Sequence, residues 1–252
     1  MEWLRTVTNR NAIQRLQSGY RSAVEALFPN RCPICEELVD SQGELCGDCL
    51  GKLKYITSPF CMICGKQLDN ELAETCSDCG RRHHSFIRGV GALAYTKEIK
   101  QSMYRFKYGN RREYAAFYGD IIVKLKGHII MSWKPDVIIP VPLHASRYRK
   151  RGYNQAALIA KEIGRRLEVP VEEGLLIRTV NTAPQKELND KERTKNTKNA
   201  FQVTHNIVKY KRVLLVDDIY TTGATLDACS DVLTIAGAVQ VYFAAVCIGR
   251  GF

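Results

Sequence analysis

Four Cys-x-x-Cys pairs follow one another between residues 32 and 79, and they constrain this chain of 252 residues more than any other feature. A Cys-x-x-Cys turn presents two thiolates together, and two such turns complete a tetrahedral zinc site. A redox dithiol is the competing interpretation, but four successive pairs fit it poorly. We therefore predict two structural zinc ions in a double zinc-ribbon module over residues 30–82. The predicted ligands are Cys32, Cys35, Cys46, Cys49, Cys61, Cys64, Cys76 and Cys79.

The order of the pairs leaves two zinc pairings open. Sequential pairing would place the first four cysteines on one ion and the last four on the other, whereas interleaved pairing would mix them. Gly47, Gly65 and Gly80 are expected at knuckle positions that require positive φ. Cys229 and Cys247 stand alone in apolar segments and are interpreted as core residues.

Charge and cysteine content indicate the compartment and the kind of partner. The net charge is +11, and basic residues cluster over residues 97–112 and 147–151, which favours an anionic partner such as nucleic acid or phosphate. So many cysteines outside disulfides suit a reducing compartment, and residues 1–28 carry no secretory signal, so we expect a cytoplasmic protein. Apolar runs are too short to span a bilayer, so no membrane insertion is expected.

Hydrophobic periodicity predicts an α/β domain over residues 83–252 after an N-terminal helix over residues 1–29. Strands are expected at 91–95, 137–142, 213–216 and 239–247. Helices are expected at 97–126 with a break at Gly109, at 154–167, and at 226–236 with Gly237 as its cap. Residues 178–199 are polar and are interpreted as a solvated loop, or as a loop with one short helix. Strands and helices in alternation imply a parallel sheet flanked by helices.

Residues 213–225 combine a buried strand, two acids and a small-residue loop before a helix. Asp217 and Asp218 fall at the carboxyl end of the strand, where ligands of open α/β sheets bind. Adjacent carboxylates are costly to bury unless a cation or hydroxyl groups meet them. The loop that follows suits a phosphate, because backbone N–H groups and threonine hydroxyls face a helix N-terminus. The loop residues are Thr221, Thr222, Gly223, Ala224 and Thr225.

This segment resembles the phosphoribosyl pyrophosphate signature of type I phosphoribosyltransferases. The resemblance implies that Asp217 and Asp218 meet the ribose hydroxyls at the catalytic position, that the loop holds the 5′-phosphate, and that magnesium accompanies the ligand. The loop after the first buried strand would then bind pyrophosphate, with Arg178 and Gln185 opening a polar lid. The further candidate ligand residues are Pro142, Leu143, His144, Arg147, Arg151, Arg178 and Gln185.

Together with the cysteine pairs, three further stretches make the chain similar to the ComF family of ComFC-like competence proteins. They are residues 140–143, residues 149–155, and residues 185–188 with Arg193 and Asn196. The resemblance implies a type I phosphoribosyltransferase-like domain behind zinc ribbons and a role in DNA uptake. A ComFA-like helicase is an implied partner.

Two functions follow from these patterns. One is a DNA-uptake protein that binds phosphoribosyl pyrophosphate with magnesium and also single-stranded DNA. The other is a phosphoribosyltransferase that transfers phosphoribose to a base or an amine. Tyr104 and Tyr108 alternate with basic residues, which suits stacking on exposed bases, although both could pack inward from one helix face. The candidate nucleic-acid residues are Arg105, Lys107, Arg149 and Lys150.

Overall fold

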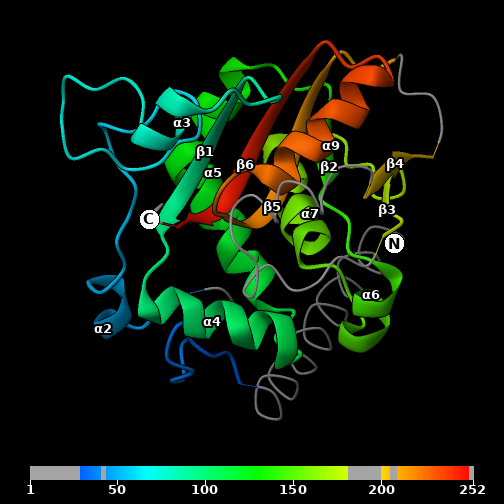
Figure 1. Cartoon of the computed structure of the whole chain (residues 1–252). Helices are drawn as coiled ribbons and strands as arrows, with labels where there is room; N and C mark the ends of the chain where they lie inside the picture. Colours follow the sequence, from blue (N-terminus) through cyan, green and yellow to red (C-terminus); the bar gives the residue numbers. More distant parts are fainter. Residues whose placement is uncertain (1–28, 41–43, 181–199, 205–208, 250–252) are drawn as a thin grey trace, which may run out of the picture.

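The computed structural model describes residues 29–40, 44–180, 200–204 and 209–249, and its centre is a four-stranded parallel sheet (Figure 1). The strand order across the sheet is β1-β6-β5-β2. These strands are β1 (Arg88–Ala94), β2 (Val137–Pro140), β5 (Arg212–Tyr220) and β6 (Gln240–Ile248). A separate antiparallel pair is formed by β3 (Leu176–Arg178) and β4 (Phe201–Val203). The predicted parallel α/β sheet is thereby confirmed.

Strand β5 shows why the sheet carries two hydrophobic cores. Its side chains alternate, so that Leu214 and Val216 enter one core while Val213 and Leu215 enter the other. Strand β6 alternates in the same way from Val241 to Val246, after which Cys247 enters the same core as Val246. A period of two residues places successive side chains on opposite faces, and near-continuous apolar runs mark a strand that is covered on both.

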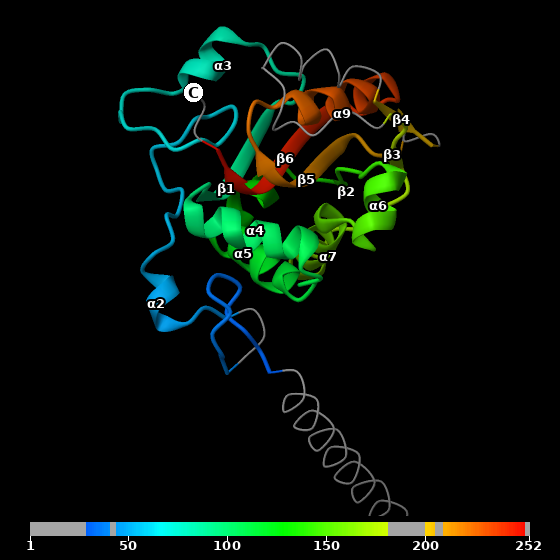
Figure 2. The same cartoon turned by 60° about the horizontal axis from the view of Figure 1, so that its bottom comes forward.

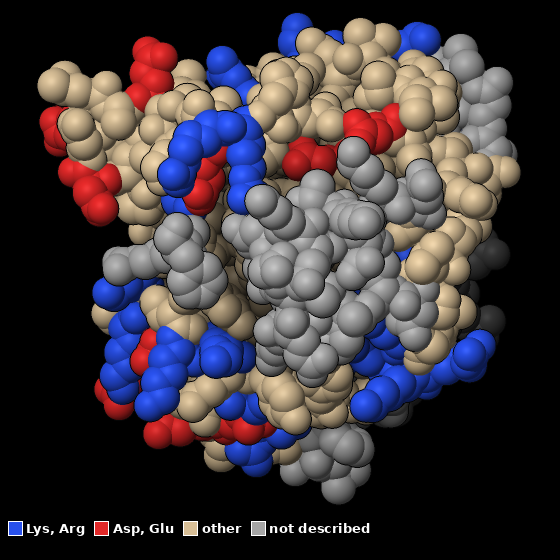
Figure 3. All heavy atoms as spheres, in the orientation of Figure 1, with Lys and Arg blue, Asp and Glu red and all other residues tan. Residues whose placement is uncertain are grey.

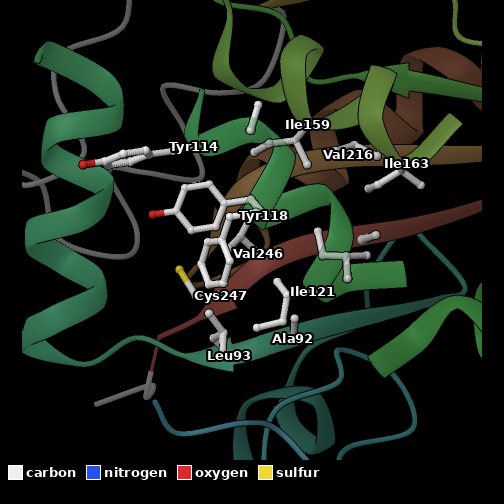
Figure 4. Close-up of a cluster of buried hydrophobic side chains, with 14 of the residues drawn as sticks. Ala92, Leu93, Tyr114, Tyr118, Ile121, Ile159, Ile163, Val216, Val246 and Cys247 are labelled. Atoms are coloured by element: carbon white, nitrogen blue, oxygen red, sulfur yellow. The ribbon is translucent and has the colours of Figure 1, made fainter. Parts of the chain in front are cut away.

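Helices α4 (Lys97–Tyr108), α5 (Tyr114–Ser132) and α7 (Gln155–Leu167) cover the face that we call the α4 face (Figure 2). Figure 4 shows part of this core, where Tyr118 and Ile121 of α5 lie beside Val246 of β6. Helix α9 (Ala224–Ile235) and the β3–β4 pair cover the opposite face, here called the α9 face.

The two cysteine clusters join different faces of the sheet. Cys32 and Cys49 belong to the core of the α4 face, whereas the four cysteines between 61 and 79 belong to the core of the α9 face. The second cluster packs directly on β1, where the amide of Gly89 donates to the carbonyl of Ile63 at 2.7 Å. The boundary predicted at residue 82 therefore separates two sequence motifs but not two hydrophobic cores.

The breaks and caps of the helices follow the sequence closely. Gly109 separates α4 from α5, Asn154 caps α7 by accepting from the amide of Ala156 at 3.1 Å, and Gly237 follows α9 at a φ of 109°. The predicted helix over residues 97–126 thus becomes two helices, the second of which continues to Ser132.

Three expectations differ from the structure or fall outside it. The expected polar loop after β2 contains a short helix, α6 (Ala145–Arg151), which His144 caps. Strand β5 continues four residues past 216 because β6 pairs with it as far as Tyr220. The predicted N-terminal helix and most of the predicted lid fall outside the described residues. Among the helices that the structure does describe, none is both long and apolar enough to cross a bilayer.

Candidate functional site

Each cysteine cluster is built from one knuckle and one short helix. Cys35 is followed by Glu36 at a φ of 69°, and Cys64 is followed by Gly65 at 73°. The second pair of each cluster lies at a helix N-terminus, with Cys46 before α2 (Gly47–Leu50) and Cys76 before α3 (Ser77–Arg81). The expectation of positive φ at Gly47 and Gly80 was wrong, because both glycines are helical. A left-handed residue is needed only where the chain reverses directly after a pair.

The sulfur positions fit two tetrahedral zinc ions. The four sulfurs of each group lie within 4.8 Å of one another, and the groups follow the sequential pairing. Cys35 and Cys46 bring their sulfurs to 3.4 Å, and Cys64 and Cys76 to 3.7 Å. Tetrahedral Zn–S bonds of about 2.3 Å require sulfurs about 3.8 Å apart. Four thiolate donors indicate structural zinc, and they leave no coordination position open.

Asp217 and Asp218 lie within β5 rather than beyond its end, since Asp217 is paired with Ala245 of β6. Successive strand residues point to opposite faces, so Asp218 faces the α4 side and Asp217 faces the α9 side. The amide of Asp218 donates to a carboxylate oxygen of Asp217 at 2.8 Å. Burial, together with the neighbouring carboxylate of Asp218, raises the pKa of Asp217 to about 7.

Lys107 supplies the counter-charge on the α4 face. Its Nζ lies 2.8 Å from Oδ2 of Asp218, and both side chains are mostly buried. Burial works against the ammonium, but the Asp218 carboxylate outweighs it and raises the pKa of Lys107. Lys107 was predicted as a nucleic-acid contact; the structure instead places it at the acidic pair. A single sequence cannot reveal this pairing, because the two residues are far apart in the chain.

The 221–225 segment, which we call the phosphate loop, turns from β5 into α9. Gly223 is the N-cap of α9 at a φ of 85°, and no side chain caps the helix there. A Cβ at Gly223 would lie 2.9 Å from Cε1 of His84 and 3.1 Å from the hydroxyl of Tyr220. Both its conformation and its surroundings therefore require glycine. The first-turn amides of α9 have the arrangement that binds anions at helix N-termini.

His84 is a residue of this region that the sequence analysis missed. It is buried, and its Nδ1 lies 3.1 and 3.0 Å from the carboxylate oxygens of Asp227 in the first turn of α9. The amide of Ser85 donates to the same carboxylate at 2.9 Å. A histidine just after a zinc ribbon gives no sequence signal for such a contact.

Part of the predicted pyrophosphate region converges on Asp217. A β-bridge joins His144 to Arg178 of β3, and Arg178 interacts electrostatically with both Arg147 and Asp217. Burial first, and then the neighbouring positive charge, lower the pKa of Arg178 and of Arg147. A second anionic group would relieve this accumulation of positive charge. Pro142 and Leu143 lead into this region from β2, and Gln185 falls outside the described residues.

Arg151, whose positive charge helps to lower the pKa of Arg147, lies against the end of α4. Its guanidinium donates to Gln155 at 2.9 Å and to the hydroxyl of Tyr108 at 3.0 Å, and it stacks 4.8 Å from the Tyr108 ring centre. Tyr104 and Tyr108 lie 5.0 Å apart and are 62% and 51% exposed. The inward packing considered for these two rings is therefore excluded.

The remaining basic candidates have different environments. Arg149 and Lys150 are exposed on α6. Figure 3 shows Lys and Arg in two groups in the lower half of the view, on the left, where α4 begins, and on the right, where α6 lies; acidic side chains accompany the left group. Arg105 instead donates to the carbonyl of Ile34 and lies 3.5 Å from Glu36, so it contacts the first zinc ribbon.

Comparison with known proteins matches both halves of the chain. A double zinc ribbon domain matches residues 23–80, and a phosphoribosyl transferase domain matches residues 118–251. Competence protein F of Haemophilus influenzae is 33% identical over 225 residues, covering 85% of this chain and 95% of that protein. Competence protein ComFC of Bacillus subtilis is 31% identical over 198 residues, covering 75% and 77%. The DNA utilization protein YhgH of Salmonella typhi is 26% identical over 226 residues, covering 87% and 97%.

Proposed function

Because this chain belongs to the ComF family, which joins a double zinc ribbon to a phosphoribosyl transferase domain, we propose that it binds phosphoribosyl pyrophosphate in DNA uptake. The ligand would occupy the carboxyl end of β5, with its ribose at the acidic pair and its 5′-phosphate on the phosphate loop. Single-stranded DNA would bind on the neighbouring basic surface. The names of the relatives, competence and DNA utilization proteins, support the DNA-uptake role.

The observation that carries the proposal is the continuity of β5, the phosphate loop and α9. Two carboxylates at the end of a central strand are followed directly by a helix N-terminus that no side chain caps. Ribose hydroxyls donate to carboxylates, whereas a phosphate accepts from backbone amides. One sugar phosphate therefore satisfies both groups, and neither group needs the other for folding.

The donor set also suits a magnesium ion. Asp217 and Asp218 offer carboxylate oxygens, which are the ligands that Mg²⁺ prefers, and Asp217 is buried with a raised pKa that a cation would lower. Magnesium binds protein carboxylates together with substrate phosphates, and it would neutralise part of the pyrophosphate charge. Arg147 and Arg178 supply further positive charge for the pyrophosphate on the α9 side of the two aspartates.

Titration calorimetry with phosphoribosyl pyrophosphate, with and without magnesium, tests this site. We expect magnesium-dependent binding to the wild type and at least a tenfold loss in Asp217→Asn/Asp218→Asn, since several hydrogen bonds to charged groups are removed. Asp231→Asn is the matched control, because Asp231 is an exposed acid on α9. Equal heats from the wild type and the double variant would exclude the acidic pair as the binding site.

Turnover separates a binding protein from a transferase. Pyrophosphate release would be followed with candidate bases, amines and single-stranded DNA as acceptors. Binding without release supports a ligand-binding role, whereas release that depends on one acceptor supports the phosphoribosyltransferase alternative.

The exposed aromatic and basic surface supports the DNA part of the proposal. Tyr104 and Tyr108 expose their rings near the end of α4, and Arg149 and Lys150 directly precede Arg151 on α6. Aromatic rings stack on unpaired bases, while basic side chains neutralise phosphates and release counterions. Such a surface favours a single strand, whose bases are accessible, over a duplex.

Fluorescence anisotropy with a labelled oligonucleotide tests the surface at several salt concentrations. We expect Tyr104→Ala/Tyr108→Ala to weaken binding and Arg149→Gln/Lys150→Gln to reduce the salt dependence as well. Lys52→Gln/Lys54→Gln removes the same charge from exposed positions in the ribbon region and serves as the control. Equal effects of the two charge variants would contradict a specific role for α6.

A further inference from the structure

We propose that His84 is a positioning residue that anchors the phosphate loop to the second zinc ribbon through Asp227. The inference rests on the proposed function, because the loop is the site assigned to the 5′-phosphate. It adds that phosphate binding by this loop depends on a residue outside the phosphoribosyl transferase signature. That residue lies in the segment between the second ribbon and β1.

The contact between His84 and Asp227 is direct, and its histidine side is buried while Asp227 is partly exposed. The His84 side chain is 3% exposed, and its Nδ1 lies near both carboxylate oxygens of Asp227. Since Nδ1 faces a carboxylate, it carries the proton and donates. The Asp227 carboxylate therefore accepts from two adjacent residues, through Nδ1 of His84 and the backbone amide of Ser85. The buried Nε2 of His84 has no hydrogen-bond partner among the described residues.

The histidine is also packed against the loop itself. Its Cε1 and Nδ1 would lie 2.9 and 3.1 Å from a Cβ at position 223, so the ring edge lies against the Gly223 backbone. Movement of the imidazole would therefore open space beside the residue that begins α9. The ring contacts both the cap and the first turn of the helix that would hold the phosphate.

Aromatic stacking connects His84 to the second cysteine cluster. Its ring stacks on Phe86 at 4.6 Å, and Phe86 meets the ring edge of Phe243 at 4.8 Å. Tyr220, the last residue of β5, stacks on Phe243 at 5.0 Å. Phe86, Phe243 and Tyr220 share one hydrophobic core with the four cysteines of the second cluster. Tyr220, which precedes the phosphate loop, and Leu226, which follows it, thus belong to the same core as this cluster.

The negative charge of Asp227 explains why its position matters for phosphate binding. An acid in the first turn interacts favourably with the positive end of the helix, and it would compete with a phosphate for that position. His84 and Ser85 hold the carboxylate in the contact with the ribbon segment. Without the imidazole donor, the carboxylate can turn toward the first-turn amides. We therefore expect the phosphate loop to be less ordered and its affinity for phosphate to be lower.

Two substitutions of nearly equal shape separate hydrogen bonding from packing. His84→Asn keeps a side-chain N–H near the position of Nδ1, whereas His84→Leu fills similar space without a donor. His83→Leu is the control, because His83 is the exposed neighbour of the same type. The readouts are calorimetric affinity for phosphoribosyl pyrophosphate and ribose 5-phosphate, amide hydrogen exchange over residues 221–226, and zinc content.

We expect His84→Leu to weaken both ligands by about tenfold or more, since a hydrogen bond to a charged group is lost. Exchange over residues 221–226 should accelerate in that variant, while exchange in β1 and the zinc content stay unchanged. His84→Asn should recover most of the affinity and protection, and His83→Leu should match the wild type. Equal behaviour of His84→Asn and His84→Leu, or unchanged loop exchange in His84→Leu, would overturn the proposal.

The exchange measurement also separates this inference from the proposed function. If the wild type binds neither ligand, the assignment of the loop to a sugar phosphate fails. Faster loop exchange in His84→Leu and its recovery in His84→Asn would still establish the anchor. If the wild type binds ligand but all three variants bind equally well, only the role of His84 is lost.

Discussion

The ammonium nitrogen of Lys107 lies 2.8 Å from a carboxylate oxygen of Asp218, where the last turn of α4 meets the acidic end of β5. Helix α4 is itself tied to the first zinc ribbon, since Arg105 donates to the carbonyl of Ile34. His84 forms the corresponding link between the second ribbon and α9. Each ribbon therefore contacts an element that carries a different half of the candidate site.

Replacing Lys107 with methionine should lower the free energy of unfolding by about 2 kcal/mol, because a mostly buried carboxylate loses its counter-charge. Adding Asp218→Asn should restore part of the loss, with a coupling energy of about 1 kcal/mol or more in a double-mutant cycle. Urea unfolding measures both quantities. Lys100→Met, an exposed change on the same helix, should be nearly neutral. Strict additivity of the two substitutions would contradict the pairing.

Asp217 should make the protein less stable as the pH rises from about 4 to about 7. Burial and the Asp218 carboxylate raise its pKa from 3.8 to about 7, so the folded chain retains a proton that the unfolded chain releases. The stabilisation is complete below about pH 4 and is lost once the pH passes the folded pKa. Asp217→Asn should therefore become more stable than the wild type above pH 7, by at most about 4 kcal/mol at 1.36 kcal/mol per pKa unit.

Urea midpoints of the wild type and Asp217→Asn between about pH 5 and pH 8 measure this difference. Titration of the zinc thiolates affects both proteins alike and cancels in the comparison. Asp231→Asn, on the exposed side of α9, should show no such trend. A stability difference that does not change with pH would exclude the raised pKa.

Gly65→Ala should destabilise the second ribbon and its contact with β1. At a φ of 73°, a Cβ would lie 2.8 Å from the carbonyl oxygen of Gly89 and from Cα of Val90. The left-handed conformation alone costs about 1–2 kcal/mol for a residue with a Cβ, and the backbone contact adds to that. Gly51→Ala is the control, since Gly51 has a φ of −80° and open space around it. Thermal unfolding should separate the two variants clearly.

Removing one zinc ligand should destabilise the whole chain rather than a separate module. Cys64→Ser should lower the zinc content from two ions to one per chain, and calorimetry should show one unfolding transition at a lower temperature. The reason is that each cysteine cluster belongs to a core shared with the sheet. Cys229→Ala, at a buried cysteine outside both clusters, should retain two ions. A separate low-temperature transition with an unchanged main transition would contradict shared cores.

Features that depend on neighbouring residues could be predicted from the sequence. Cys-x-x-Cys spacing indicated the zinc ligands, apolar runs indicated the strands, and Gly109, Asn154 and Gly237 marked where helices end or begin. The order of β5, the phosphate loop and α9 could be predicted for the same reason. Local conformation and hydrophobic periodicity depend on residues that are close together in the chain.

Contacts between residues far apart in the chain could not be predicted in this way, because they depend on how the helices and ribbons pack on the sheet. Pairing of β5 with β6 as far as Tyr220 keeps both aspartates in the strand and turns them to opposite faces. Packing of α4 against the sheet places Lys107 beside Asp218, and packing of the ribbon segment places His84 beside Asp227. These contacts join residues far apart in the chain, and their geometry is set by how the helices and ribbons cover the sheet. No local pattern in a single sequence encodes that choice.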